Sequence, residues 1–359
     1  MKIGIACGGT GGHVFPGLAT AEVLRERGHE ITLWVSGRDV EKEAITGWDG
    51  NVIAVHARGF PSRPGLNYFN TLWLFWKAFQ QCRRAMRIRP PDVLLAMGGY
   101  ASVAPVMAAV SLSIPVILHE ANVIPGRANR LLGRWAKAFA LGFEETRTHI
   151  RHRNMIYTGM PLRKTNAENI HPDWNVFKPG VFTILVMGGS RGAHALNEVA
   201  AKAILNLRAD GKVAQIIHLT GTDDENTVRK TYQDCGVTHL VFAFLRDVPQ
   251  AYRMASLAVC RAGASTCAEL AKYGVPSLLI PYPHAASNHQ LANARACASA
   301  GAADVVEEKK LTAEWLAAYI CALMTDHDKL QRMKNAALKR ADNDAASVLA
   351  GLVLETGKE

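Results

Sequence analysis

The sequence predicts an α/β protein with two domains, each a parallel sheet covered by helices on both faces. Three observations lead to this fold class. Short apolar strand patterns alternate with helical patterns along both halves of the 359-residue chain. Those strand patterns are continuously apolar, as expected for a parallel sheet that is buried on both faces. Each half also begins with a strand that leads into a glycine-rich turn and a helix.

The first half contains five strand patterns and two long helical patterns. The strands are expected at Lys2–Cys7, Glu30–Ser36, Asn51–Ala57, Asp92–Met97 and Ile114–His119. The helices are expected at Pro16–Arg27, which Gly28 ends, and at Tyr68–Arg87. The stretch Val93–Leu118 carries no charge, but it contains two adjacent glycines and two prolines, which a membrane-spanning helix tolerates poorly. It is therefore predicted to be a buried strand–helix–strand unit.

The second half repeats the alternation. Strands are expected at Phe182–Met187, Gln215–Thr220, Leu240–Phe244, Leu257–Cys260 and Ser277–Ile280. Helices are expected at Ala193–Leu207, Asp247–Met254, Ala268–Tyr273, Gln290–Ala300 and Thr312–Met324.

A polar segment near residues 164–181, with two prolines, is interpreted as the linker between two domains. The first domain is predicted to span residues 1–163 and the second residues 164–334. The last stretch, about 328–354, reads as helical. Residues from about 335 to 359 are expected to pack back onto the first domain.

The net charge of +10 is concentrated in the first half. Residues 1–163 carry 20 Lys and Arg against 11 Asp and Glu, whereas residues 164–359 carry 21 against 20. A positive field of this kind suits an anionic partner. No zinc-finger, helix-turn-helix or RNP-like pattern supports nucleic acid as that partner. An anionic membrane surface or a pyrophosphate substrate is favoured instead.

The cysteines and the start of the chain bear on the cellular compartment of the protein. The seven cysteines form no C-x-x-C pair and lie mostly in apolar segments, which is typical of reduced thiols in a cytosolic protein. Met1 leads directly into a strand pattern, so no signal peptide is expected.

Two glycine turns mark corresponding points in the two halves. Gly8-Gly9-Thr10-Gly11-Gly12-His13 follows the first strand of one half, and Gly188-Gly189-Ser190-Arg191-Gly192-Ala193 follows the first strand of the other. Such turns let the backbone approach a phosphate closely at a helix start. Neither matches G-x-G-x-x-G or G-K-[ST], which disfavours a nicotinamide enzyme and a P-loop nucleotidase. Ligands are expected at the carboxyl ends of the strands.

The stretch 256–294 is the strongest candidate for a nucleotide pocket. Gly263 is expected to relax a turn before a helix that starts at Thr266, whose free N–H groups would bind a diphosphate. Glu269, Gln290 and Asn293 could close over the same crevice. Two structural alternatives stay open at this point. Thr266 and Glu269 also fit a capping box, and Gln290 and Asn293 also fit a solvated helix face.

Seven motifs carry a resemblance to a known family, the MurG glycosyltransferases of bacterial peptidoglycan synthesis. They are GGTGGHVFPGLA (8–19), MGGYAS (97–102), HEAN-x-x-PG-x-AN (119–129), G-x-PLR (159–163), GGSRGA-x-x-LN (188–197), CRAGA-x-T-x-AE (260–269) and PYPHA-x-x-x-HQ-x-x-NA (281–294). The resemblance implies the GT-B fold, with two Rossmann-like parallel-sheet domains facing across a cleft.

The resemblance also implies a reaction. N-acetylglucosamine (GlcNAc) would move from UDP-GlcNAc to the 4-hydroxyl of the muramyl sugar of the undecaprenyl-linked lipid I, with inversion, to give lipid II. The enzyme would act peripherally at the cytoplasmic face of the membrane, without a cofactor. A UDP-GlcNAc 2-epimerase and a non-catalytic nucleotide-sugar-binding protein are the alternatives.

Inverting transfer needs a base for the acceptor hydroxyl and groups that stabilise the departing diphosphate. His13 is the first candidate base because of its place at the loop tip and its titration range. Glu120 is the rival candidate, as base or as a group that holds the acceptor. By resemblance, Thr10, Gly11, Gly12, Tyr100 and Asn122 contact the acceptor or the transferred sugar. The two glycines could instead serve only to make a tight turn.

The donor residues are likewise carried over by resemblance. Arg163 and Ser190 would contact the diphosphate, where a guanidinium and a hydroxyl can neutralise developing charge. The uracil would lie against Leu245, and Glu269 would accept both ribose hydroxyls. The remaining donor contacts are expected from Ala264, Ser265, Thr266 and Gln290. Many family members have two glutamines where this chain has His289-Gln290, so the role of His289 stays open.

No metal site is expected. The D-x-D spacing occurs only at Asp326/Asp328 and Asp342/Asp344, far in sequence from both glycine turns, and these residues are interpreted as helix caps or solvated faces.

Residues 68–79 are apolar around most of a helix, and four arginines (Arg83, Arg84, Arg87 and Arg89) follow. Aromatic side chains beside basic ones suit a lipid headgroup boundary, which favours peripheral membrane binding over a wholly buried helix.

Overall fold

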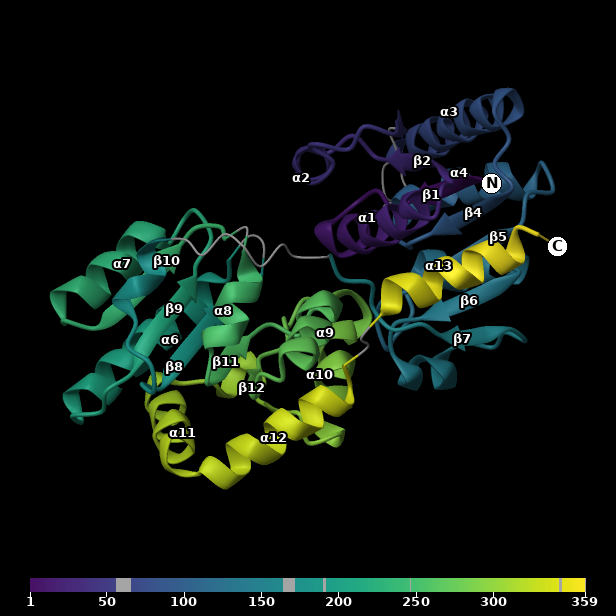
Figure 1. Cartoon of the computed structure of the whole chain (residues 1–359). Helices are drawn as coiled ribbons and strands as arrows, with labels where there is room; N and C mark the ends of the chain where they lie inside the picture. The colour runs from purple at the N-terminus through teal and green to yellow at the C-terminus, as the bar shows by residue number, and fades with distance from the viewer. Residues whose placement is uncertain (56–65, 164–171, 190–191, 246, 342–343, 359) are drawn as a thin grey trace. The chain divides into compact units, whose positions relative to one another are not determined.

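The computed structural model describes residues 1–55, 66–163, 172–189, 192–245, 247–341 and 344–358 (Figure 1). The chain forms two compact units. Unit 1 comprises Met1–Lys164 with Asp342–Glu359, and unit 2 comprises Thr165–Ala341. Each unit contains one parallel sheet with helices on both faces, which confirms the predicted fold class.

Unit 1 has a seven-stranded sheet in the order β3-β2-β1-β4-β5-β6-β7. The strands are β1 (Lys2–Ala6), β2 (Glu30–Val35), β3 (Asn51–Ala54), β4 (Val93–Ala96), β5 (Val116–Glu120), β6 (Ala138–Leu141) and β7 (Met155–Tyr157). The sequence analysis did not predict β6 and β7, two short strands at one edge of the sheet. The uncharged stretch forms β4, a helix and β5, as predicted.

The helices of unit 1 divide between the two faces of its sheet. They are α1 (Gly11–Glu26), α2 (Asp39–Ala44), α3 (Leu66–Ile88), α4 (Val103–Val110), α5 (Arg127–Leu132) and α13 (Ala345–Thr356). Side chains from α1 and α13 pack with Val93 and Leu95 of β4. Side chains from α3 and α4 pack with Leu94 and Ala96 of the same strand. Alternate residues of one strand therefore point into two separate cores, which explains why the strand is apolar throughout.

The start of α1 differs from the prediction. The helix begins at Gly11, five residues before Pro16, because the carbonyl of Thr10 already accepts hydrogen bonds from the N–H groups of His13 (2.9 Å) and Val14 (3.1 Å). Proline was expected at the first helical position, where its missing N–H costs nothing. Here it lies inside the helix. His13 is consequently in the first turn of α1.

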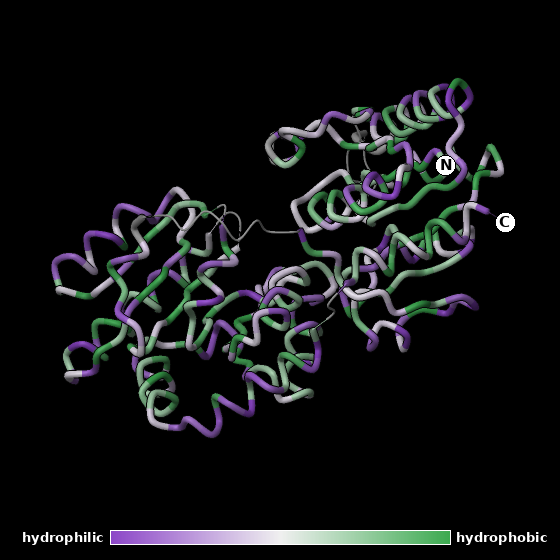
Figure 2. The backbone as a smooth tube through the Cα atoms, viewed as in Figure 1, coloured by the Kyte–Doolittle hydropathy of each residue, from purple (hydrophilic) through white to green (hydrophobic). Residues whose placement is uncertain are grey.

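Unit 2 has a six-stranded sheet in the order β10-β9-β8-β11-β12-β13. The strands are β8 (Thr183–Met187), β9 (Gln215–Leu219), β10 (Thr238–Phe242), β11 (Leu257–Cys260), β12 (Ser277–Leu279) and β13 (Ala303–Val305). The helices are α6 (His194–Ala209), α7 (Glu225–Asp234), α8 (Val248–Met254), α9 (Ala264–Tyr273), α10 (His289–Ser299), α11 (Ala313–Thr325) and α12 (His327–Lys339). The sequence analysis missed α7 and β13. In both units the strands are among the most hydrophobic segments of the chain (Figure 2).

The helical tail is two helices rather than one stretch over residues 328–354. Helix α12 lies in unit 2, where Leu338 packs against Gly274 at the end of α9. Helix α13 lies in unit 1, where it packs on α1. Asp326 caps α12 by accepting from the Lys329 N–H, and Asp344 caps α13 by accepting from the Ser347 N–H. The interpretation of these two aspartates as caps is confirmed, and Asp342 lies outside the described residues.

Two further observations concern the membrane and the thiols. Within the described part of the chain, none of the helices has both the length and the hydrophobicity needed to cross a bilayer. All seven cysteines are free thiols, and burial raises the pKa of Cys7 to about 12.

Candidate active site

Both sheets reverse their strand order beside their first strand. In unit 1 the reversal lies between β1 and β4, and in unit 2 it lies between β8 and β11. The loops that follow these four strands carry the glycine motifs at residues 8–12, 98–99, 188–193 and 261–263. Ligands of open parallel sheets bind at this point, beyond the carboxyl ends of the strands. The topology therefore brings the predicted site residues together within each unit.

In unit 1, His13 lies between the loops that follow β1 and β4. Its Nδ1 is 3.1 Å from the Thr10 hydroxyl. A Cβ added at Gly99 would lie 3.1 Å from Cε1 of the same imidazole, and Gly99 has φ +75°. Only glycine lets the backbone after β4 pass this close to the ring in this conformation. The imidazole is half-buried, and His13 lies in the first turn of α1 rather than at a loop tip.

In the turn formed by residues 8–12, the space available for a side chain is small at Gly8 and larger at Gly12. A Cβ at Gly8 would approach the Ser36 backbone nitrogen to 2.7 Å, whereas a Cβ at Gly12 would meet nothing closer than 3.7 Å. Gly8 is therefore a packing requirement. Gly11 and the exposed Gly12 lie in the first turn of α1, where their N–H groups belong to a helix start.

Tyr100 lies in the 3₁₀ turn after β4 (Tyr100–Ser102). Its hydroxyl is buried, with no hydrogen-bond partner among the residues that the structure describes. The Arg38 guanidinium lies over its ring, 5.2 Å from the centroid. A buried hydroxyl of this kind is a group that a bound sugar could satisfy.

Glu120 and Asn122 belong to one hydrogen-bonded loop after β5. Glu120 is 3% exposed, and its Oε1 accepts from the Asn122 N–H at 3.0 Å. Its Oε2 accepts from the Gly126 N–H at 2.9 Å and from the Asn129 amide at 2.8 Å. Burial raises the pKa of this carboxyl group, while these hydrogen bonds act in the opposite direction. Both oxygens are thus engaged in shaping the loop that presents Asn122.

Arg163 lies at the end of the first segment of unit 1 and makes its contacts within that unit. Its Nη2 donates to the Ala44 carbonyl at 2.8 Å, and its guanidinium lies 4.3 Å from the centre of the Phe15 ring. Burial lowers its pKa. Ser190, its expected partner in binding the diphosphate, lies outside the described residues.

In unit 2, helix α9 begins earlier than predicted. Its first residue is Ala264, so Thr266 is inside the helix, and the capping-box alternative is wrong. Glu269 instead accepts a hydrogen bond from the Tyr252 hydroxyl at 2.8 Å, and burial raises its pKa to about 7. Gly263 has φ −65°, which any residue can adopt, so the expectation of a glycine-specific turn there is also wrong.

The other donor-side positions lie at the same edge of the sheet. Ala264 and Ser265 open α9, and Leu245 is buried in the loop after β10. Gln290 accepts from the Tyr282 N–H at 2.9 Å, and Asn293 donates to the Ala262 carbonyl at 3.2 Å. Asn293 is fully buried, which rules out a solvated face for that residue.

His289 has a local contact. Its Nδ1 lies 2.7 Å from the Ala286 carbonyl, to which it donates, just after two residues with left-handed backbone, Ser287 and Asn288. The contact secures the turn that leads into α10.

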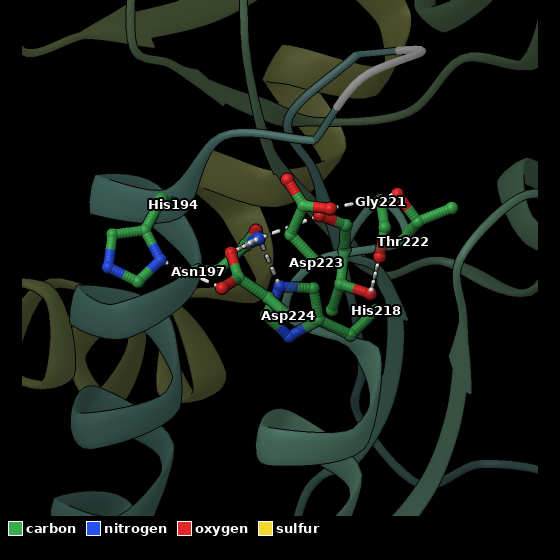
Figure 3. Close-up of polar contacts among 8 residues, drawn as sticks. His194, Asn197, His218, Gly221, Thr222, Asp223 and Asp224 are labelled. Carbon is green, nitrogen blue, oxygen red and sulfur yellow. Dashed lines mark hydrogen bonds and ion pairs between the residues drawn. The ribbon is translucent and has the colours of Figure 1, made fainter.

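A buried polar network stands behind the second glycine turn (Figure 3). The Asn197 side-chain amide donates to the Thr220 carbonyl at 2.8 Å and to Asp224 at 2.7 Å. Its oxygen lies 3.1 Å from His218 Nε2, and His218 Nδ1 lies 2.9 Å from the Tyr232 hydroxyl. Burial lowers the pKa of His218 to about 3, so the ring is neutral.

Because the Asp224 carboxylate only accepts, the donors run in one direction, from Tyr232 through His218 and Asn197 to Asp224. The carbonyl that Asn197 holds is the one that Gly192 approaches. A Cβ at Gly192 would lie 1.9 Å from it.

The sequence analysis assigned no role to two side chains that support these loops. Arg261 is 7% exposed, pairs with Glu308 and donates to the Ile280 carbonyl at 3.2 Å. Glu41 is fully buried beside the first glycine turn. Arg261 belongs to the motif 260–269, which was a usable signal. Glu41 belongs to no glycine motif, and its helix is only six residues long.

Comparison with known proteins shows which class of enzymes shares these two domains. Residues 3–141 match the glycosyltransferase family 28 N-terminal domain, and residues 183–349 match the glycosyltransferase family 28 C-terminal domain. The two sheets, with their glycine loops at the strand-order reversals, are thus those of a family 28 glycosyltransferase.

Full-length relatives identify the particular family within this class of glycosyltransferases. A protein of Anaeromyxobacter sp. (strain Fw109-5) is 38% identical over 358 residues, which is 99% of this chain and 93% of the relative. A protein of Geobacter sulfurreducens is 36% identical over 363 residues, covering 100% of both chains. Both are named UDP-N-acetylglucosamine--N-acetylmuramyl-(pentapeptide) pyrophosphoryl-undecaprenol N-acetylglucosamine transferase. The chain belongs to this family, the MurG family.

Solved structures agree with the assignment. The crystal structure of Acinetobacter baumannii MurG superposes with a TM-score of 0.80 at 28% identity, covering 99% of this chain and 100% of that one. A UDP-N-acetylglucosamine 2-epimerase structure superposes with a TM-score of 0.74, covering 100% of this chain and 97% of that one. At 14% identity, the epimerase likeness concerns the fold alone.

Proposed function

We propose that the chain transfers N-acetylglucosamine from UDP-GlcNAc to the 4-hydroxyl of the muramyl sugar of lipid I and so forms lipid II. The observation that carries the proposal is the 36–38% identity, over essentially the whole chain, to relatives named for this transfer. The glycine loops and the polar side chains around them lie at the edges where such substrates bind. We therefore propose for this chain the GlcNAc transfer for which the relatives are named.

On the acceptor side, His13 is proposed as the general base. In the tautomer whose Nδ1–H donates to the Thr10 hydroxyl, the lone pair on Nε2 can accept the proton of the 4-hydroxyl. The deprotonated oxygen then attacks the anomeric carbon of GlcNAc from the face opposite UDP, which departs as the diphosphate. This geometry inverts the anomeric configuration.

Glu120 is proposed to act through Asn122 rather than as the base. Its two oxygens accept hydrogen bonds from Asn122, Gly126 and Asn129, and they are committed to the loop that presents Asn122. Asn122 would hydrogen-bond the transferred sugar, and the buried Tyr100 hydroxyl would gain a partner from a bound sugar.

On the donor side, the start of α9 at Ala264, Ser265 and Thr266 would bind the diphosphate through its N–H groups. Glu269 would accept the ribose hydroxyls, Leu245 would lie against uracil, and Gln290 would contact the GlcNAc. Arg163 and Ser190 are proposed to neutralise the charge that develops on the leaving UDP.

An anionic membrane surface is proposed as the third partner, at the cytoplasmic face. The outer face of α3 exposes Leu72 (40%), Trp73 (51%) and Trp76 (56%), and Lys77 lies 3.5 Å from the centre of the Trp73 ring. The opposite face of this helix is in the core of unit 1, so the wholly buried alternative is wrong. Exposed tryptophans beside cations are typical of helices that lie in the headgroup region.

Unit 1 carries further basic side chains that could contact an anionic membrane. Arg84 and Arg87 of α3 are exposed, whereas Arg89 pairs with Glu30 at 2.8 Å. A pocket of about 650 Å³ is lined by five cations and contains no carboxylate in its lining. The cations are Arg130, Arg134, Lys137, Arg151 and Arg153.

Incubation of the purified chain with UDP-GlcNAc and a short-chain lipid I analogue, with EDTA present, tests the reaction. The proposal predicts release of UDP together with a disaccharide product of inverted anomeric configuration. Formation of UDP and a free sugar without acceptor dependence, or of an epimerised nucleotide sugar, would contradict it.

Vesicle co-sedimentation tests the membrane partner. The double variant Trp73→Ser/Trp76→Ser should bind anionic vesicles more weakly by about tenfold, while its rate on a water-soluble acceptor stays at the wild-type value. The matched control is Trp315→Ser, which removes an exposed tryptophan from unit 2. Equal vesicle binding of the double variant and the wild type would contradict this part of the proposal.

A further inference from the structure

Glu41 is a buried carboxylate that joins two loops of unit 1. Its side chain is 0% exposed, although it is the third residue of a six-residue helix near the protein surface. Oε1 accepts hydrogen bonds from the Gly9 N–H at 2.5 Å and from the Ser36 hydroxyl. Oε2 accepts from the Gly37 N–H at 2.6 Å and from the Arg38 N–H at 3.2 Å. One donor comes from the glycine turn after β1, and the other three come from the loop after β2.

Part of this arrangement has an ordinary explanation. A glutamate in the third position of a helix commonly accepts from the N–H of the residue before the helix, as Glu41 does from Arg38. That contact needs only one oxygen and leaves the side chain at the surface. It does not account for full burial or for the bond to Gly9, 32 positions away in the sequence. Removing a carboxylate from water is costly unless hydrogen bonds replace its hydration. The four hydrogen-bond donors therefore form a specific binding site for the Glu41 carboxylate.

The residue that Glu41 holds is central to the first glycine turn. Gly9 has φ +124°, and its carbonyl accepts from Arg38 Nη1 at 3.4 Å. Both backbone groups of Gly9 are thus bonded to the segment 38–41. A Cβ at Gly9 would lie 3.7 Å from His13 Nδ1, and the next residue, Thr10, contacts the same nitrogen. The position of the imidazole therefore depends on the anchoring of Gly9.

The same anchor reaches the loop after β4. With its backbone N–H bonded to Glu41, Arg38 extends its guanidinium over the ring of Tyr100, 5.2 Å from the centroid. Arg38, Gly9 and Tyr100 consequently form one connected edge beside His13, with the Glu41 carboxylate beneath it.

We propose that Glu41 is a positioning residue for the acceptor half of the reaction. It fixes the first glycine turn and Arg38, so that His13 and the acceptor-binding edge keep their geometry. The inference rests on the proposed transferase function, and it adds a residue that contacts neither substrate.

The test is Glu41→Gln, with donor and acceptor kinetics measured separately. A glutamine keeps one acceptor oxygen, but its NH2 group faces the N–H groups of Gly37 and Arg38 in one amide orientation and the N–H group of Gly9 in the other. The expected result is a fall in kcat of about 10- to 100-fold and a raised KM for the lipid I analogue. The KM for UDP-GlcNAc should stay within about twofold of wild type, because most of the proposed donor residues (Leu245, Ala264, Ser265, Thr266, Glu269 and Gln290) belong to unit 2.

Two further variants keep the test decisive. Glu30→Gln is the matched control, because it removes a carboxylate from the amino end of β2, where Glu30 pairs with Arg89. It should leave both KM values unchanged. Ser36→Ala deletes one of the four donors without touching the backbone and should shift the same acceptor parameters in the same direction, less strongly. If Glu41→Gln does not fold, the acceptor kinetics of Ser36→Ala decide the test.

The separate KM values distinguish positioning from plain destabilisation, because a general loss of structure would affect donor and acceptor alike. Wild-type acceptor kinetics in the folded variants, or equal losses for donor and acceptor, would overturn the inference. Absence of transfer by the wild type would instead refute the proposed function.

Discussion

The first glycine turn, in unit 1, is held by a carboxylate, whereas the second, in unit 2, is packed against a backbone carbonyl. Glu41 accepts directly from the Gly9 N–H, and this bond joins the turn to the loop after β2. Gly192 approaches the Thr220 carbonyl, which the Asn197 amide holds from the other side. Both anchors come from the loop after the strand next to the first one, β2 or β9. In both units the glycine turn is thus held from the same place in the fold, by a carboxylate in unit 1 and by a backbone carbonyl in unit 2.

In both units the acidic residue that follows the second strand is engaged in hydrogen bonds within its own unit. Many dinucleotide-binding domains use an acidic residue after the second strand to bind a ribose. Here Glu41, in the first turn of α2, and Asp224, just before α7, follow the corresponding strands, and their carboxylates are occupied by these hydrogen bonds. In unit 2 the half-buried Glu269, in the helix after β11, is the carboxylate proposed to bind the ribose.

The largest effect is expected from Gly192→Ala. The new Cβ would lie 1.9 Å from the Thr220 oxygen, at a φ of +76°, so the turn must move. We expect an apparent Tm about 5–10 °C lower and a loss of UDP-GlcNAc binding of at least about 100-fold. Gly12→Ala is the control for folding, because its Cβ has room, and calorimetry with UDP titration measures both quantities. A stable Gly192→Ala protein with normal UDP affinity would refute the steric anchor.

The next effect is expected from Asn197→Asp. A carboxylate cannot donate to the Thr220 carbonyl, so this buried group loses its side-chain donor, and the new negative charge would stand beside Asp224. The expected loss of stability is about 2–4 kcal/mol, with a raised KM for UDP-GlcNAc. Asn206→Asp is the control on the same helix and should be close to neutral, because the hydrogen bonds of the network involve Asn197, His218, Tyr232, Thr220 and Asp224. Equal behaviour of the two variants in chemical denaturation would argue against the network.

Glu269→Gln should separate stability from donor binding. The folded pKa of Glu269, about 7, is above its ordinary value of 4.5, so the folded state binds the proton more tightly than the unfolded chain. Stability is therefore lost as pH rises from about 4.5 through about 7, when the buried group ionises. We expect the variant to gain Tm over wild type at pH 8 and little at pH 5, while its KM for UDP-GlcNAc rises. A larger Tm gain at pH 5 than at pH 8 would contradict this sign.

The smallest effect concerns acid stability of unit 2. The folded pKa of His218, about 3, is below its ordinary value of 6.5. Its contribution is therefore fully present above about pH 6.5 and is lost as pH falls toward 3, because the unfolded chain takes up the proton. His218→Gln, which can still donate and accept, should flatten the Tm decrease between pH 7 and pH 5. An unchanged slope in thermal scans would show that His218 does not link unit 2 to pH.

The sequence predicted the layers of the fold because that information is local. Buried parallel strands such as Val93–Ala96 are apolar on both faces, and glycine turns stand out in composition. It did not predict β7, whose three residues gain their strand character only by pairing with β6. The start of α9 was also misplaced, because Thr266 and Glu269 imitate a cap that the fold does not use.

The contacts within the candidate site could not be predicted from the sequence either. The motif residues around His13 and Glu269 could be named from resemblance, but their contacts could not. The partners of Glu41 are a glycine 32 positions earlier and three residues in the loop just before its helix, and no periodicity links them. Contacts of this kind depend on which loops the sheet order makes adjacent, and that order is decided by the whole chain.

The central claim is that each glycine turn serves one substrate, the first the lipid-linked acceptor and the second UDP-GlcNAc. The most direct measurement is the pair of KM values, for UDP-GlcNAc and for a lipid I analogue, in Glu41→Gln and Asn197→Asp beside wild type. The account predicts a crossed result, in which Glu41→Gln raises only the acceptor KM and Asn197→Asp raises only the donor KM. A rise of the same KM in both variants would contradict it.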